Sequence, residues 1–308
     1  MIVFAASDKG GTGRSVTSAN LAYQRALAGD DVAYVDFDFG SPTAPAVFDV
    51  PDMQRGIAIE DGGGLHSYLE GTAAEAARVD IWRRTEHTVL RRTPIGAGRL
   101  VLLPGDVSGG EFVTDGDSVD RCVDLLLRLD REFDLILVDL SAGRSYAMDM
   151  VLEATARREL RNVVSRWVVF HRWTRQHVIA AAGLVFEARG LLDGGAERGH
   201  DKDALRSVIR FVRAAVPDPD SSLWSHLSPA QSAWMQMYDE RLRRLAAELG
   251  VGDSVLLGTV PLEPILQWRE QLITEEEVVA TRIANKETLE ALEEIARRLT
   301  DDIHWGQP

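Results

Sequence analysis

The sequence of 308 residues contains a single cysteine, Cys122. One cysteine cannot form an intramolecular disulfide, and it excludes a metal site built from paired cysteines. The surrounding residues predict a helix with Cys122 on its apolar face, as a small buried hydrophobic residue. The histidines are scattered. The closest pair, His171 and His177, is six residues apart, which puts the two side chains on different helix faces, so no histidine metal site is predicted.

Long apolar runs are also missing. No stretch approaches the roughly 18 uninterrupted apolar residues of a membrane span. The first residues, MIVFAASDKGG, are apolar for only a few positions and have no basic segment, so a signal peptide is not expected. A hydrophobic fraction of 45% and a charged fraction of 27% are typical of a globular protein with a large core. We expect a cytoplasmic location.

Positive charge is scarce, and lysine especially so. The net charge is −14, and only three of the 34 basic residues are lysines: Lys9, Lys202 and Lys286. A negative surface disfavours tight sequence-independent DNA binding, because such binding neutralises phosphates. The most basic stretch is expected to be a solvated face that pairs with acidic residues, with weak DNA binding as the alternative. Its arginines are Arg157, Arg158, Arg161, Arg166, Arg172 and Arg175.

Apolar segments alternate with helical patterns along the chain. The predicted strands cover residues 2–6, 32–36, 100–103, 135–139, 166–170, 208–212 and 255–260. Helices are predicted over 15–28, 65–78, 118–129 (capped by Asp117 or Ser118), 174–188 and a final amphipathic segment with Leu289, Leu292, Ile295 and Leu299. This alternation predicts an α/β fold, a doubly wound and mostly parallel sheet flanked by helices.

No linker separates the first predicted strand from the last, and no internal repeat is present. We therefore predict a single domain over residues 1–308. Residues 214–250 interrupt the alternation with a stretch of Pro, Asp and Ser and then a helical run that includes Trp224 and Trp234. This segment is predicted to be a helical insertion.

The segment KGGTGRS, Lys9–Ser15, lies between the first predicted strand and the first predicted helix. Its glycines can adopt positive φ and expose backbone N–H groups to an anion, and the following helix adds its N-terminal dipole. This context predicts a phosphate-binding P-loop, with Ser15 placed to bind Mg²⁺. The expected nucleotide-binding residues are Gly10, Gly11, Thr12, Gly13, Arg14, Ser15 and Val16.

Together with Asn20-Leu21-Ala22 and VAYVDFDFGSPT at 32–43, this loop resembles the deviant Walker A family of ParA, MinD and their relatives. FDLILVDLSAG at 133–143 resembles the family's Walker B strand and second switch. LLGTVPLEP at 256–264 is similar to its last strand and purine-side loop. The resemblance implies a P-loop NTPase fold, ATP and Mg²⁺ as cofactors, a nucleotide-dependent homodimer and a protein partner that the sequence does not identify.

The resemblance also assigns roles to single residues. Lys9 matches the signature lysine that crosses the dimer interface to the partner's nucleotide. Asp38 matches the aspartate that positions the attacking water, and Asp36 lies close to the Mg²⁺ shell. Ser15 matches a direct Mg²⁺ ligand, and Asp139 matches the Walker B carboxylate that holds Mg²⁺ through water. Lys9, Asp36 and Asp38 are therefore the catalytic candidates. Gly143 and Arg144 follow the Walker B-like strand; a functional role for them and a plain loop without one are equally favoured.

Two residues depart from the family pattern. Arg14 stands where the loop normally has a second lysine, and its guanidinium is larger and planar. We expect nucleotide binding to survive and turnover to be slow, because phosphoryl transfer depends on positioning. Arg213 stands where the family often has an asparagine that reads adenine, so a preference for adenine follows from the resemblance alone.

Several relatives do not fit. One cysteine does not suit the iron–sulfur carriers or the arsenite pumps of this superfamily, and the tail DDIHWGQP lacks the tyrosines of bacterial tyrosine kinases. MinD proteins end in a basic amphipathic helix that binds anionic lipid. The last helix here, EALEEIARRLTDD, is mixed to acidic, so we expect it to pack on the core, and no membrane contact is predicted.

The sequence thus predicts an ATP-dependent dimer switch with weak ATPase activity. The alternative is a nucleotide-binding regulatory module with little or no hydrolysis because of Arg14. A third reading, a small-molecule ligase or kinase on the same scaffold, needs a substrate pocket that the sequence does not identify.

Overall fold

The computed structural model describes residues 1–41, 43–107, 109–218 and 227–306. Within these residues the strands are β1 Ile2–Ala6, β2 Val32–Phe37, β3 Val79–Asp80, β4 Leu100–Leu103, β5 Leu135–Leu140, β6 Ser165–Arg172, β7 Ile209–Val216 and β8 Leu256–Pro261. They form one sheet in the order β3-β4-β2-β5-β1-β6-β7-β8. Every neighbouring pair is parallel except the antiparallel pair β3 and β4.

The α-helices are α1 Arg14–Leu27, α2 Ala44–Val47, α3 Leu65–Leu69, α4 Ile81–Arg84, α5 Gly116–Glu132, α6 Tyr146–Ala156, α7 Arg175–Phe186, α8 Leu191–Glu197, α9 Lys202–Ser207, α10 Pro229–Glu248 and α11 Lys286–Thr300. Short 3₁₀ helices cover Pro51–Met53, Ile59–Asp61, Leu90–Arg92, Arg158–Leu160, Asp253–Val255, Ile265–Gln267 and Asp302–His304, and a π-helix covers Glu276–Ala280.

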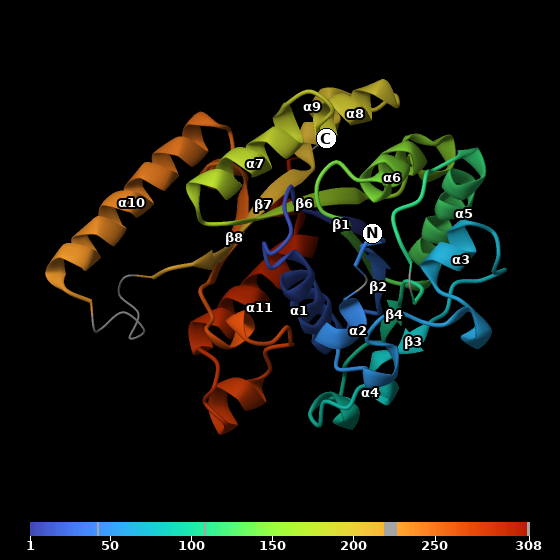
Figure 1. Ribbon diagram of the computed structural model, residues 1–308, viewed down its shortest axis with the longest axis horizontal. Helices are drawn as coiled ribbons and strands as arrows, with labels where there is room; N and C mark the ends of the chain where they lie inside the picture. Colours follow the sequence, from blue (N-terminus) through green and yellow to red (C-terminus); the bar gives the residue numbers. More distant parts are fainter. Residues whose placement is uncertain (42, 108, 219–226, 307–308) are drawn as a thin grey trace.

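Helices cover both faces of the sheet because the strands are apolar on both sides. In β1, Ile2, Phe4 and Ala6 belong to a core shared with α5, α6, α7 and α8. The alternate residues Val3 and Ala5 belong to a second core shared with α1, α2 and α11. Figure 1 shows these two helical layers on opposite sides of the sheet. The predicted doubly wound, mostly parallel α/β fold is confirmed.

The predicted helix over 65–78 is wrong in its length. Helix α3 ends at Leu69, because Gly71 takes a φ of 78° and the N–H groups of Thr72 and Ala73 donate to the carbonyl of Ser67. The predicted cap of the next long helix is also wrong. Asp115 caps α5: its carboxylate accepts the Ser118 N–H, and the Ser118 hydroxyl accepts the Asp115 N–H.

The segment 214–250 begins as the last residues of β7 and contains α10. This helix projects at the edge of the molecule in Figure 1 and buries only Leu242 and Ala246. Trp234 is exposed and stacks on Tyr238 with ring centroids 5.2 Å apart. Trp224 lies outside the described residues.

The last helix, α11, packs as predicted. Its apolar residues Leu289, Leu292, Ile295 and Leu299 are buried against β8 and α1. Among the described helices, none has the length and apolar character needed to cross a membrane.

Cys122 lies fully buried on the inner face of α5, as predicted, and burial raises the pKa of its thiol to about 12. A buried, protonated thiol is a poor nucleophile. The native protein should therefore react with a thiol reagent such as DTNB far more slowly than the denatured chain, which should release one equivalent. Rapid labelling of the native protein at neutral pH would contradict this packing.

Candidate functional site

The predicted phosphate loop leaves the carboxyl end of β1 at the centre of the sheet. There β1 lies between β5 and β6, and the chain is wound in opposite directions on the two sides of this point. Ligands of open α/β sheets bind at such a switch point, outside the carboxyl ends of the strands. The fold therefore puts the loop where a ligand is expected.

The loop has the backbone that its glycines predict. Gly11 and Gly13 have φ values of 71° and 79°, and no atom lies within 4 Å of a Cβ built on Gly10 or Gly11. Helix α1 begins directly after Gly13 without a side-chain cap and without an acidic residue in its first turn. Its first N–H groups are thus free of a competing carboxylate and suited to an anion.

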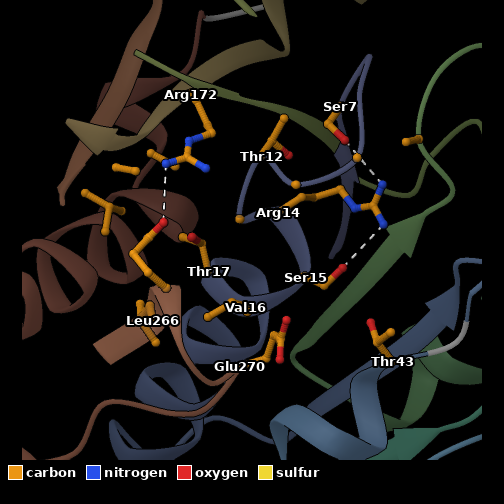
Figure 2. A pocket seen from close by; sticks show the side chains of 18 of the residues that line it. Ser7, Thr12, Arg14, Ser15, Val16, Thr17, Thr43, Arg172, Leu266 and Glu270 are labelled. Carbon is orange, nitrogen blue, oxygen red and sulfur yellow. Dashed lines mark hydrogen bonds between the residues drawn. The ribbon is translucent and has the colours of Figure 1, made fainter. Parts of the chain in front are cut away.

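A cavity of about 430 Å³ opens in front of this loop. Its size is in the ordinary range for a small-molecule site. Gly10, Gly11, Thr12, Gly13, Arg14, Ser15, Val16 and Asp38 all line it, whereas Lys9, Asp36 and Asp139 do not. Figure 2 shows the loop side chains on one side of the cavity and Arg172 and Leu266 on the other. The structure therefore brings the predicted binding loop and one of the three catalytic candidates to a common space.

Arg14 turns its side chain toward carboxylates. Its Nε donates to Asp139 at 2.5 Å, and its Nη2 donates to Asp38 at 2.7 Å. Weaker bonds of 3.3 Å run from Nη1 to the Ser7 hydroxyl and from Nη2 to the Ser15 hydroxyl, as Figure 2 shows. The Arg14 side chain is only 6% exposed. Sequence reasoning expected Arg14 among the phosphate contacts, and in this structure its charge is directed to the acidic residues beside the loop.

Burial opposes the charge of Arg14, but the neighbouring Asp139 and Asp38 outweigh it and raise the pKa of the guanidinium. Arg14 therefore stays a cation throughout the pH range of a folded protein. For Asp38, burial raises the pKa of the carboxyl while Arg14 opposes that rise.

Strand register explains why these groups meet. Asp36 of β2 pairs directly with Asp139 of β5, and Ala5 of β1 pairs with Asp139 on the other side. Asp139 is held at both oxygens, since its second one accepts the Tyr34 hydroxyl at 2.9 Å. Tyr34 in turn lies 2.9 Å from the Ser18 hydroxyl of α1. The sequence pattern did not reveal Ser7 or Tyr34 as supports of this cluster.

Asp36 has a different environment from Asp38. It is 1% exposed and accepts the backbone N–H groups of Ala44 and Asp38 at 3.2 and 3.3 Å. Burial, followed by the charge of Asp139, raises the pKa of Asp36 well above its ordinary value. In the part of the chain that is described, Asp36 has no cationic partner, so it holds the loop after β2 rather than facing the cavity.

Lys9 is exposed at the tip of the loop and forms no ion pair within the described residues. The loop beside it is fixed by the segment that follows β5: the Gly143 N–H donates to the Ser7 carbonyl at 2.7 Å, and the Arg144 guanidinium lies 3.6 Å from the Asp8 carboxylate. Lys9 is thus displayed outward from a fixed backbone.

The cavity wall opposite the loop includes residues from the ends of β6 and β8 and the segment after β8. Arg213 does not contribute to it, because its guanidinium stacks 4.1 Å over Trp173 and pairs with Asp253 at 2.8 Å. Glu263 does line the cavity and is 2% exposed. One carboxylate oxygen accepts from Asn285 and Thr288, and the other has no hydrogen-bond partner among the described residues.

Sequence reasoning named Arg172 only as part of the basic stretch, and it did not single out Glu263. Arg172 ends β6 and reaches Gln267 at 3.4 Å across the cavity. Glu263 belongs to LLGTVPLEP, a segment matched as a motif without a role for each residue. The signal in both cases is a charged residue at the carboxyl end of a strand: Arg172 is the last residue of β6, and Glu263 lies two residues beyond the end of β8.

The donor set predicted for Mg²⁺ is already bonded within the chain. The two predicted ligands, Ser15 and Asp139, both contact the Arg14 guanidinium, and so does the neighbouring Asp38. Elsewhere in the described ranges, no group of three or more His, Cys, Asp or Glu side chains is arranged to hold a metal ion. With Arg14 in this position, the residues do not fit a magnesium site.

Comparison with known proteins gives a family and a fold. The protein-family model described as the CobQ/CobB/MinD/ParA nucleotide binding domain matches residues 3–304 of this chain. The MinC:MinD cell division complex from Aquifex aeolicus has a TM-score of 0.61 at 17% identity, covering 97% of this chain and 94% of that one. MinD from Pyrococcus horikoshii, solved with Mg-ADP, has a TM-score of 0.56 at 18% identity, covering 97% of this chain and 96% of that one. A ParA family ATPase from Chlorobium tepidum has a TM-score of 0.55 at 14% identity, covering 96% of this chain and 98% of that one.

One curated relative is similar over a shorter region. An iron–sulfur cluster carrier protein from Saccharolobus solfataricus is 30% identical over 107 residues, which cover 34% of this chain and 35% of that protein. The chain thus spans about a third of this relative's length in the aligned part.

The two loop glycines provide a matched test of the backbone. Gly11→Ala should lower the free energy of unfolding by roughly 1–2 kcal/mol, because a side chain at positive φ is strained. Gly10→Ala should leave it nearly unchanged, since its Cβ meets open space and its φ is not in the left-handed region. Urea denaturation measures both. Equal stabilities for the two variants would mean that the loop has another conformation.

Proposed function

Since the chain belongs to the CobQ/CobB/MinD/ParA nucleotide-binding domain family, we propose that it binds ATP in the cavity beside the glycine loop and acts as a nucleotide-dependent regulatory module with little hydrolysis. The observation that carries this proposal is the buried pairing of Arg14 with Asp38 and Asp139.

Several features support nucleotide binding. The loop offers backbone N–H groups at positive-φ glycines, and the uncapped start of α1 adds its dipole. The cavity continues from this loop to Val260 and Pro261 at the end of β8 and to Leu266, which gives an apolar wall for a base. MinD from Pyrococcus horikoshii was solved with ADP, and this chain shares its fold. The choice of ATP, and of adenine, follows from the family resemblance.

The low hydrolysis follows from the state of Asp38. A carboxylate that positions water needs a free oxygen directed at the water, and Arg14 Nη2 occupies the Asp38 carboxylate at 2.7 Å. The ion pair with Asp139 also holds the Arg14 guanidinium in place, so the guanidinium is not free to move toward the phosphoryl group and stabilise the negative charge of the transition state. Phosphoryl transfer depends almost entirely on such positioning, so turnover is expected to be slow.

Dimerisation on ATP remains part of the proposal, and the position of Lys9 supports it. An exposed ammonium without an ion pair in the described chain, carried on a backbone fixed by Gly143, is suited to reach a nucleotide bound by a second copy. The homodimer, a protein partner that reads it and a cytoplasmic location stay predictions. Cluster carriage is not proposed, because Cys122 is buried in α5.

DNA binding is proposed to be weak at most. Of the predicted basic cluster, Arg166 is buried and bonds to the Leu299 carbonyl and to Asp302, and Arg157 lies close to Asp120 and Glu153. These pairs leave less free positive charge for phosphates than the sequence count indicates.

Hydrolysis tests the proposal directly. In single-turnover assays with saturating ATP, wild type should release phosphate very slowly, and Arg14→Lys should be faster by about tenfold or more, equivalent to about 1.4 kcal/mol in the barrier. Lysine keeps the charge but cannot bridge both carboxylates, so it frees Asp38. Asp38→Ala in the Arg14→Lys background should remove the gain. Fast wild-type turnover would contradict the proposal.

Dimerisation has its own test. Lys9→Ala should abolish ATP-dependent dimers while leaving nucleotide affinity nearly intact, because Lys9 does not line the chain's own cavity. Lys202→Ala is the matched control, since Lys202 is also exposed and lies on α9. Light scattering in the presence of ADP or of ATP measures whether each protein is a monomer or a dimer. A Lys9→Ala protein that dimerises like wild type would show that Lys9 has no role across the interface.

A further inference from the structure

We propose that the Arg14 guanidinium takes the place of the divalent cation at this site, so that the protein binds nucleotide without Mg²⁺. The inference rests on the proposed function, because it concerns the same cavity. It starts from the disagreement between the predicted magnesium ligands and the contacts that these residues make.

The guanidinium contacts both residues that the resemblance assigns as Mg²⁺ ligands, Ser15 and Asp139, and it also contacts Asp38, to which the resemblance assigns the attacking water. Asp139, the Walker B carboxylate, accepts from Nε, while Asp38 and the Ser15 hydroxyl accept from Nη2. Ser7 accepts from Nη1 and completes the ring of oxygens. Mg²⁺ requires oxygen ligands at about 2.0–2.1 Å in near-octahedral geometry. The oxygens that would supply that shell here surround a planar cation instead.

The cation is fixed in place by burial and charge. The Arg14 side chain is 6% exposed and Asp139 only 1%. Breaking either ion pair would leave an uncompensated charge in the interior, which is strongly unfavourable. A magnesium ion brought to the same oxygens would also lie against a guanidinium that does not deprotonate. The two cations therefore compete for one set of ligands, and the covalently attached one is always present.

The position of Arg14 lets it face a nucleotide as the metal would. Arg14 lines the cavity with Ser15 and Asp38. A guanidinium has five N–H groups, and the four hydrogen bonds to Ser7, Ser15, Asp38 and Asp139 leave one without a partner in the described residues. This N–H is available to an anionic oxygen, and a phosphate oxygen is the oxygen that such a loop brings near.

Charge at the site is consistent with a single positive group. The third nearby carboxylate, Asp36, accepts backbone N–H groups and does not contact Arg14. Asp36 therefore does not compete with Asp38 and Asp139 for the guanidinium, and one positive group faces two of the three carboxylates.

The test is calorimetric titration of the full chain with ATP, once in excess EDTA and once in excess Mg²⁺. Wild type should bind with nearly the same affinity in both buffers. Arg14→Lys, which keeps one positive charge but lacks the fork that bridges both carboxylates, should bind more tightly with Mg²⁺ by about tenfold or more, equivalent to about 1.4 kcal/mol. Circular dichroism checks that the variant is folded. The comparison of wild-type affinity in EDTA and in Mg²⁺ does not depend on the variant.

Each outcome separates the two proposals. Equal wild-type affinity in EDTA and Mg²⁺ supports replacement of the metal by Arg14. Wild-type binding that is lost in EDTA and restored by Mg²⁺ overturns the inference while leaving the proposed nucleotide-binding function intact. Binding in neither buffer by a folded protein overturns the proposed function, and the inference with it.

Discussion

The site depends on one buried cation held between two carboxylates. Arg14 joins the start of α1 to the ends of β2 and β5 through Asp38 and Asp139. Removing one partner of such a buried pair typically costs about 3–5 kcal/mol, because the remaining charge stays uncompensated. The conformation of the glycine loop, which ends at Arg14, is therefore tied to the carboxyl edge of the sheet before any ligand arrives.

The surrounding groups are arranged around this cation. Tyr34 donates to the Asp139 oxygen that Arg14 Nε does not use and lies next to Ser18, which links α1 to β5 a second time. Asp36 receives backbone N–H groups instead of a cation, and its raised pKa reflects burial beside Asp139. Three acidic residues at one sheet edge thus have different electrostatic roles, set by which of them the guanidinium reaches.

The sequence predicted the architecture well because most strands are buried on both faces and appear as apolar runs. It missed β3, whose two residues, Val79 and Asp80, are too few for any periodicity. The family was also predicted from the motifs and is confirmed by the match over residues 3–304. Helix ends were less accurate, as Asp115 shows, because a cap depends on local backbone bonds.

Within the site, the sequence identified the residues but not their directions. That Arg14 turns to Asp139 depends on the register of β1 and β5, which residue spacing along one segment does not contain. Arg213 turns away because Trp173 and Asp253, distant in sequence, hold its guanidinium. The roles assigned to Lys9 and Asp38 from the family stay predictions.

The two edges of the sheet limit how copies of this protein can associate. At one edge β3 offers only two residues, and it runs against the direction of its neighbour. At the other, β8 pairs with β7 through two register shifts and ends in Pro261, which has no N–H to donate. Short, irregular or proline-containing edges resist strand addition. Association by extending the sheet into a continuous ribbon is thereby disfavoured, so a homodimer of the kind proposed would have to form through loops and helices.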